Sequence, residues 1–131
     1  MIKLYTDYWQ GVEELGEEID SPIWEKVESA INLLNQREKT QVVLKREDWS
    51  NISIGGGNGK YHVCFTTPDE RFFVLNDTSK KDMESTEELV VGGQIGNYPS
   101  PSIVSLNLVI KAVKFYFEYG KINKELSWTE E

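Results

Sequence analysis

Between residues 40 and 92 the chain changes from helical to strand-like patterning, and this change constrains the fold most strongly. Short runs rich in β-branched and aromatic residues recur at 42–44, 52–54, 61–65, 72–75 and 88–91. Turn signals separate them, including the Asn58-Gly59 and Pro68-Asp69 pairs. Such runs joined by tight turns are typical of antiparallel strands linked by hairpins. The central part of the chain is therefore predicted to form an antiparallel meander.

Two amphipathic helices are predicted on either side of this meander. Ser21-Pro22 is a typical helix start, with serine as N-cap and proline at the first helical position, and apolar residues then follow at helical spacing over 22–35. Ser105 can cap a second helix over 106–119. Gly120 suits the left-handed position that ends such a helix.

The remaining segments complete an α+β fold, an antiparallel meander sheet with two helices packed on it. Residues 2–9 are predicted as a first strand, the acidic segment 11–20 as a loop or a short turn, and 126–129 as a last short strand, with a turn through 98–101. No repeat or low-complexity linker interrupts the sequence, so residues 1–131 are predicted to form a single domain. We expect four apolar residues to be largely buried: Ile110, Val113, Phe117 and Trp128.

Charge and cysteine content limit the partners and the compartment. Asp and Glu number 22 against 14 Lys and Arg, giving a net charge of −8 without a basic stripe, so nucleic-acid binding is not expected. Two interpretations of the acidity stay open, solubility and steering toward a basic partner. The single Cys64 excludes an intramolecular disulfide, and no leader or membrane-length apolar run is present. These features predict a cytoplasmic protein without a membrane partner.

No catalytic, cofactor-binding or metal-binding pattern emerges. A Walker motif ending at Gly59-Lys60 requires glycine at 54 and serine or threonine at 61, where the chain has Ile54 and Tyr61. His62 is the only histidine, too few for a typical zinc site. His62 and Cys64 share a strand face, but no third group completes a nucleophilic constellation. We therefore predict that the protein is not an enzyme and binds no cofactor.

The order of motifs in the second half resembles a known family. Val91-Gly92-Gly93-Gln94 leads through Tyr98-Pro99 to the second helix, which ends at Tyr119-Gly120 before the tail Leu126-Ser127-Trp128-Thr129-Glu130. With the upstream segment 52–63, this order resembles the first-numbered immunity-protein family of bacterial polymorphic toxin systems. The resemblance covers about residues 38–131. We interpret its glycines and Trp128 as residues that define the fold rather than as contacts.

The resemblance implies a cytoplasmic antidote that binds a cognate polymorphic toxin and neutralises it by occluding its active site. Members of the family often accompany deaminase-type toxins, and other toxin types also occur, so a nucleic-acid deaminase is one candidate partner. Such a toxin carries a basic substrate groove, which an acidic domain with exposed aromatic residues suits.

Toxin contacts are predicted on the N-terminal aromatic residues, the acidic segment 13–20 and the segment 82–88. The named candidates are Tyr8, Trp9, Glu17, Glu18, Asp82, Glu84, Glu87 and Glu88. Two other functions stay open: a small cytoplasmic regulatory or protein-binding module without a toxin partner, and a small hydrolase. A deep cleft lined by His62, Cys64 or paired acids would favour the hydrolase.

Overall fold

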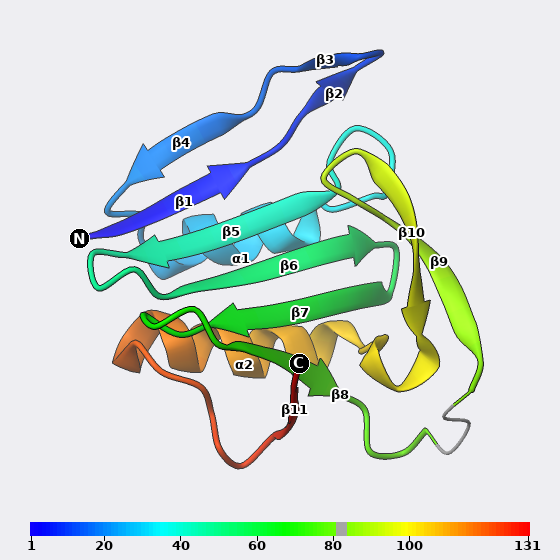
Figure 1. Ribbon diagram of the computed structural model, residues 1–131. Helices are drawn as coiled ribbons and strands as arrows, with labels where there is room; N and C mark the ends of the chain where they lie inside the picture. Colours follow the sequence, from blue (N-terminus) through cyan, green and yellow to red (C-terminus); the bar gives the residue numbers. More distant parts are fainter. Residues whose placement is uncertain (81–83) are drawn as a thin grey trace.

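A seven-stranded antiparallel sheet forms the centre of the computed structural model, which describes residues 1–80 and 84–131 (Figure 1). The strand order is β11-β8-β7-β6-β5-β1-β4. The central strands β5 to β8 follow one another as a meander, as predicted. The seven strands are β1 (Ile2–Thr6), β4 (Glu17–Asp20), β5 (Gln41–Arg46), β6 (Asn51–Gly57), β7 (Lys60–Thr66), β8 (Phe72–Asn76) and β11 (Ser127–Glu130).

Both helices, α1 (Trp24–Asn32) and α2 (Leu106–Tyr119), cover the same face of this sheet (Figure 1). The strands present alternate residues to the helices and bury them there, which follows from the period of two along a strand. The buried side chains on the three central strands are Val42, Leu44, Ile52, Ile54, Tyr61, Val63 and Phe65. The predicted α+β fold is therefore confirmed.

The two helix starts differ from each other. Ser105 caps α2 by accepting a hydrogen bond from the Leu108 amide, and Gly120 ends it with a φ of 74°, both as predicted. The prediction that Ser21 caps the first helix is wrong, because the N-cap is Ile23 and makes no side-chain hydrogen bond. Ser21 instead has a φ of 50° and donates its amide to the Ile2 carbonyl, so it belongs to the turn between β4 and α1.

The prediction of a loop or a short turn over 11–20 is also wrong, because most of the segment forms strands. This segment contains β3 (Glu13–Glu14), which pairs with β2 (Trp9–Gln10), and the edge strand β4, which pairs with β1. The predicted strand 2–9 is split into β1 and β2. The acidic side chains of β4 conceal its strand character in the sequence, and on an edge strand they discourage pairing with other chains.

A separate two-stranded ribbon, made of β9 (Thr86–Val91) and β10 (Gln94–Pro99), lies across one end of the sheet face that the helices leave open (Figure 1). The ribbon lies close to β6, because a Cβ on Gly55 would come within 2.5 Å of the Val91 side chain. Gly92 and Gly93, with φ of 62° and 77°, form its two-residue turn. The sequence predicted β9 but not β10.

The short 3-10 helix η1 (Ser100–Ser102) leads from β10 toward α2, and the tail returns to the sheet as β11. Trp128 lies opposite Leu75 of β8, and its indole N–H donates to the Asn123 carbonyl at 2.9 Å. Val113 is fully buried as predicted, whereas Ile110, Phe117 and Trp128 are only partly buried against the core. In residues 1–80 and 84–131, no helix has the length and apolar character needed to cross a membrane.

Candidate functional site

His62 and Cys64 lie on the open face of β7, where packing determines the chemistry of both. The His62 ring stacks against Tyr98 of β10 with 4.6 Å between ring centroids. Burial lowers the pKa of His62 to about 4, and burial raises the pKa of the Cys64 thiol. At neutral pH the pair therefore consists of a neutral imidazole and a protonated thiol, which is not an activated nucleophile.

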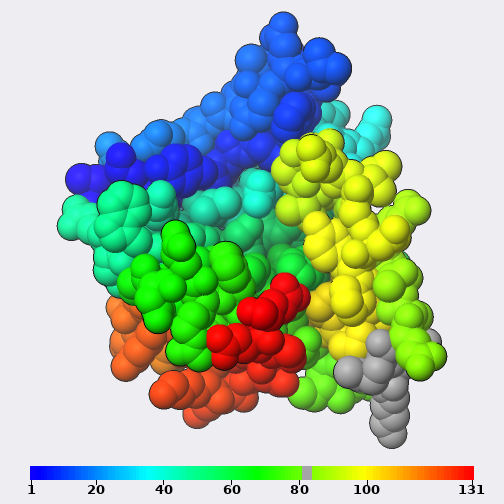
Figure 2. All heavy atoms as spheres, viewed as in Figure 1, coloured from blue at the N-terminus to red at the C-terminus, as the bar shows by residue number. Residues whose placement is uncertain are grey.

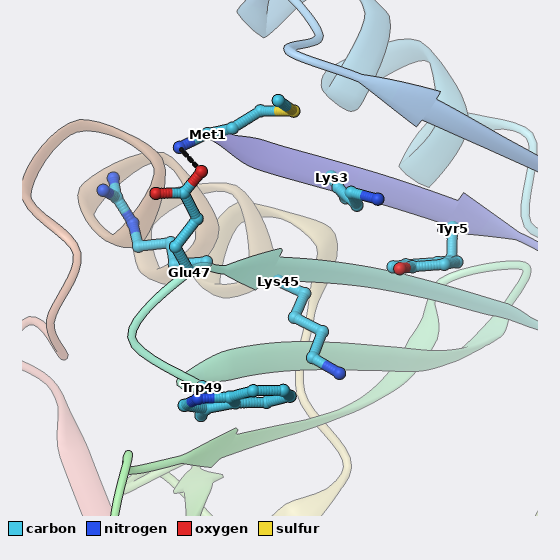
Figure 3. A pocket seen from close by; sticks show the side chains of 7 residues that line it. Met1, Lys3, Tyr5, Lys45, Glu47 and Trp49 are labelled. Carbon is cyan, nitrogen blue, oxygen red and sulfur yellow. Dashed lines mark ion pairs between the residues drawn. The ribbon is translucent and has the colours of Figure 1, made fainter.

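Two adjoining hollows lie on the part of the open face next to β1, β5 and the β5–β6 turn. The first has a volume of about 330 Å³, and the second about 510 Å³. The first is lined by Met1, Lys3, Tyr5, Lys45, Arg46, Glu47 and Trp49 (Figure 3). The second is lined by Lys45, Trp49, Asn51, Thr66, Pro68, Asp69 and Glu70. Because Lys45 and Trp49 line both, we call the two hollows together the Trp49 groove.

Trp49 is the most prominent side chain of this groove. It occupies the turn between β5 and β6, has a φ of 72°, and leaves 71% of its surface exposed. A positive φ in a bulky residue is rare and costs on the order of 1–3 kcal/mol, so the surrounding structure must hold it in place. The Lys45 ammonium lies over the indole, 5.2 Å from the ring centroid (Figure 3).

Hydrogen bonds to the end of α2 hold the Trp49 turn from beneath. One Nη atom of Arg46 donates to the carbonyls of Tyr116 and Phe117, at 3.0 and 2.6 Å. A cation is favourable there because the last carbonyls of a helix carry partial negative charge. The Ser50 hydroxyl lies 2.7 Å from the Tyr116 hydroxyl and donates to the Asp48 carboxylate. The turn is therefore rigidly mounted although its tryptophan faces solvent.

Among the described residues, Lys45 differs from Lys3 and the Met1 amino group because it has no ion-pair partner. The Lys3 ammonium lies 3.0 Å from Glu18 and 3.7 Å from Asp20, and the Met1 amino group lies 3.1 Å from Glu47. No carboxylate among the described residues lies within ion-pair distance of Lys45. Likewise, in the part of the chain that the structure describes, no three His, Cys, Asp or Glu side chains are placed to hold a metal ion.

The N-terminal aromatic candidates occupy different environments. Tyr8 is 37% exposed and lies beneath the Lys39 ammonium. Trp9 donates its indole N–H to the Asp7 carboxylate at 2.8 Å, and its ring fills the space where a Cβ on Gly93 would lie. Trp9 therefore connects the N-terminal segment to the turn of the β9–β10 ribbon.

Asp7 is the centre of that connection. Its side chain is buried, with the residue only 7% exposed, and accepts hydrogen bonds from the Thr40 amide, the Thr40 hydroxyl, the Gln41 amide and the Trp9 indole. The Thr40 hydroxyl in turn accepts a hydrogen bond from the Gly93 amide at 2.9 Å. One buried carboxylate thus joins β1, β5 and the ribbon. We call this cluster the Asp7 junction.

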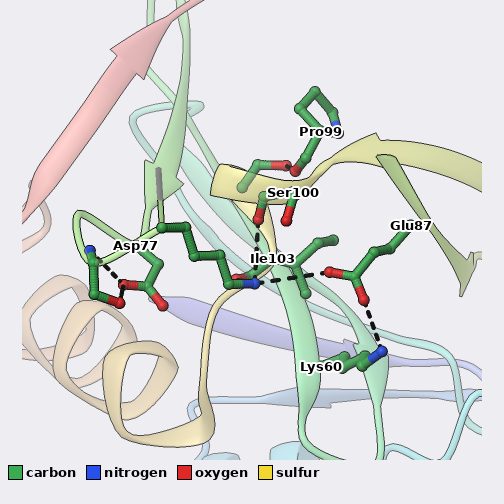
Figure 4. Close-up of polar contacts among 9 residues, drawn as sticks. Lys60, Asp77, Glu87, Pro99, Ser100 and Ile103 are labelled. Atoms are coloured by element: carbon green, nitrogen blue, oxygen red, sulfur yellow. Dashed lines mark hydrogen bonds and ion pairs between the residues drawn. The ribbon is translucent and has the colours of Figure 1, made fainter. Parts of the chain in front are cut away.

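The acidic candidates do not gather on one surface. Glu18 pairs across from Tyr5 and therefore faces the Trp49 groove, whereas Glu17 pairs across from Thr6 and faces Lys26 of α1. Glu87 lies 2.7 Å from Lys60 and 3.8 Å from Lys80, which also donates to the carbonyls of Ser100 and Ile103 (Figure 4). Glu84 and Glu88 are exposed near and on β9. Asp82 lies outside the described residues.

Comparison with known proteins identifies the family. The model of the family "Immunity protein Imm1" matches residues 16–130. The chain belongs to the Imm1 immunity-protein family. No curated protein matches the chain. The Imm1 match begins at β4 and includes α1, so it extends further toward the N-terminus than the resemblance over 38–131. Members of such a family neutralise a cognate toxin, typically without catalysis.

The glycines and the tryptophan on which the family resemblance rests occupy positions with structural roles. Gly92 and Gly93 form the ribbon turn, Gly120 ends α2, and Trp128 joins the tail to β8. Trp49 was not among the predicted contact residues, because these were chosen from the acidic and N-terminal segments. A signal was present, since a tryptophan between Glu47-Asp48 and Ser50-Asn51 stands in a polar turn rather than in an apolar run.

Proposed function

We propose that this Imm1 protein acts in the cytoplasm by binding its cognate polymorphic toxin and covering the active site of that toxin. The observation that carries the proposal is the family match over residues 16–130, which includes both helices and every strand of the main sheet except β1. The protein contributes a binding surface and no catalysis of its own. The 131 residues act together as one immunity domain.

The acidity of the chain supports a basic toxin surface as the partner. A net charge of −8 attracts a site that binds nucleic acid, such as the substrate groove of a deaminase. Among the predicted contact residues, we retain as candidates those with exposed side chains: Tyr8, Glu17, Glu18, Glu84 and Glu88. Trp9 and Glu87 instead stabilise the fold through the internal contacts described above.

We expect association with the toxin to slow markedly when salt rises. Screening shortens the reach of surface charge from roughly 10 Å at 0.1 M salt to 3 Å at 1 M. Electrostatic steering raises association rates by roughly 10- to 1000-fold, and that gain is lost at high salt. The measurement is stopped-flow binding to the purified cognate toxin domain. Equal association rates at both salt concentrations would contradict steering, and an absence of binding would contradict the proposed function.

Adjacent residues on β4 provide a matched pair for locating the steering charge. Glu18→Gln and Glu17→Gln each remove one negative charge, but from opposite faces of the strand. Glutamine at 18 keeps an acceptor for Lys3, so the local structure is preserved. If the toxin binds the open sheet face, Glu18→Gln slows association more than Glu17→Gln does. The reverse order would assign the toxin to the helical face.

A further inference from the structure

We infer that the Trp49 groove is the docking surface for a basic surface of the toxin, with the Trp49 indole as its central anchor. This inference rests on the proposed function and specifies where the partner binds. Neither the family match nor the sequence motifs designate the Trp49 turn, since the motif residues lie in the segment 52–63, in the β9–β10 ribbon, at the end of α2 and in the tail.

The fold holds Trp49 rigidly without burying it. Arg46 and Ser50 fix the turn to the end of α2, while the indole itself stays 71% exposed. Tryptophan is enriched among residues that dominate binding energies at protein interfaces. A side chain already ordered in the free protein loses little entropy on binding, so this mounting favours affinity.

The charge around the indole differs between the two ends of the groove. On the side of β1 and β4, Glu18, Asp20 and Glu47 are already paired with Lys3 and the Met1 amino group, whereas two carboxylates line the other end and have no cation at ion-pair distance among the described residues. These two are Asp69 and Glu70, in the turn between β7 and β8. An aromatic centre with a charged rim is the usual anatomy of a protein interface. This acidic end of the groove suits lysine and arginine side chains of a partner.

Lys45 adds a hydrogen-bond donor at the centre of the groove. Its ammonium lies over the Trp49 ring and has no carboxylate at ion-pair distance among the described residues, so it is placed to donate to an acceptor of the partner. Figure 2 shows the β9–β10 ribbon (yellow) over one end of this face, while the sheet strands and turns at the other end (teal and green) stay exposed.

The test compares two exposed aromatic residues on opposite sides of the sheet. Trp49→Asn removes the indole and keeps the turn, because asparagine tolerates a positive φ. Tyr119→Ala is the control, since Tyr119 is 60% exposed at the end of α2 on the helical face. Binding of the purified variants to the purified cognate toxin domain is measured by stopped flow and calorimetry. Light scattering of the protein alone reports self-association.

We expect Trp49→Asn to weaken toxin binding by at least about 30-fold, mainly through faster dissociation, and Tyr119→Ala to change it by less than about twofold. Asp69→Asn combined with Glu70→Gln is expected to slow association instead. If the toxin binds the wild type tightly and Trp49→Asn equally well, the groove assignment is wrong while the proposed function stands. A wild type that does not bind the toxin overturns both. Self-association that Trp49→Asn abolishes would assign the groove to a second copy of this chain and overturn the inference.

Discussion

Replacing Asp7 with alanine is expected to destabilise the protein by about 3 kcal/mol or more, because several buried donors lose a charged acceptor together. The affected donors are the amides of Thr40 and Gln41, the Thr40 hydroxyl and the Trp9 indole. Thermal or urea unfolding measures the loss, and for a domain of this size the melting temperature should fall by roughly 10 °C. Asp7→Asn should also destabilise the protein. The side-chain NH2 group of asparagine is a donor, so it cannot accept the hydrogen bonds that the Asp7 carboxylate accepts from these groups.

Asp20→Ala is the matched control for this prediction. It removes the same charge from an exposed position on β4, where the Lys3 ammonium lies 3.7 Å away. Exposed ion pairs contribute about 0–1 kcal/mol, so this variant should unfold close to the wild type. Equal stability of Asp7→Ala and Asp20→Ala would show that the Asp7 junction does not hold the ribbon. Hydrogen exchange should also rise in β9 and β10 of Asp7→Ala, because the Gly93 amide bonds to Thr40.

Acidification is expected to destabilise the protein through His62. Burial lowers the pKa of His62 to about 4 in the folded protein, against 6.5 for the free side chain. Between these values the unfolded chain binds a proton that the folded chain does not, so stability falls as the pH drops from 6.5 toward 4. Below about pH 4 both states carry the proton, and this group causes no further loss. The total effect is about 3 kcal/mol.

A comparison of the wild type with His62→Gln isolates this effect, because the two proteins share all carboxylates. Urea unfolding at several pH values between 7 and 4 should show the wild type losing more stability than the variant over that range. His62 packs against Tyr98 of β10, so a charged imidazole would disturb the contact between the sheet and the β9–β10 ribbon. The ribbon should therefore loosen first. Parallel stability curves for the two proteins would contradict the assignment.

Local signals predicted some elements well. The second helix has a serine cap, an apolar stripe and a terminal glycine, and α2 forms at the predicted residues. The meander strands β5 to β8 carry β-branched and aromatic residues between turn signals, and their pairing follows directly. These elements are encoded by neighbours in the sequence, which is why pattern reasoning finds them.

Elements that depend on distant contacts were not predictable in the same way. β10 contains glycine and asparagine and is a strand because β9 pairs with it. The role of Asp7 depends on Thr40 and Gln41, which lie 33 and 34 positions away. Trp49 is exposed because Arg46 and Ser50 fix its turn to α2, about 70 residues later in the chain. Tertiary contacts of this kind leave no periodic signal in the sequence.

We propose that this Imm1 protein neutralises its toxin by stoichiometric binding. The direct test is a titration of the purified cognate toxin domain with the purified protein, in an assay of the toxin's own activity. We expect activity to fall linearly and to reach zero near one protein per toxin, as tight binding at the active site requires. A toxin that keeps full activity in the presence of excess protein would contradict the account and favour a binding module without a toxin partner.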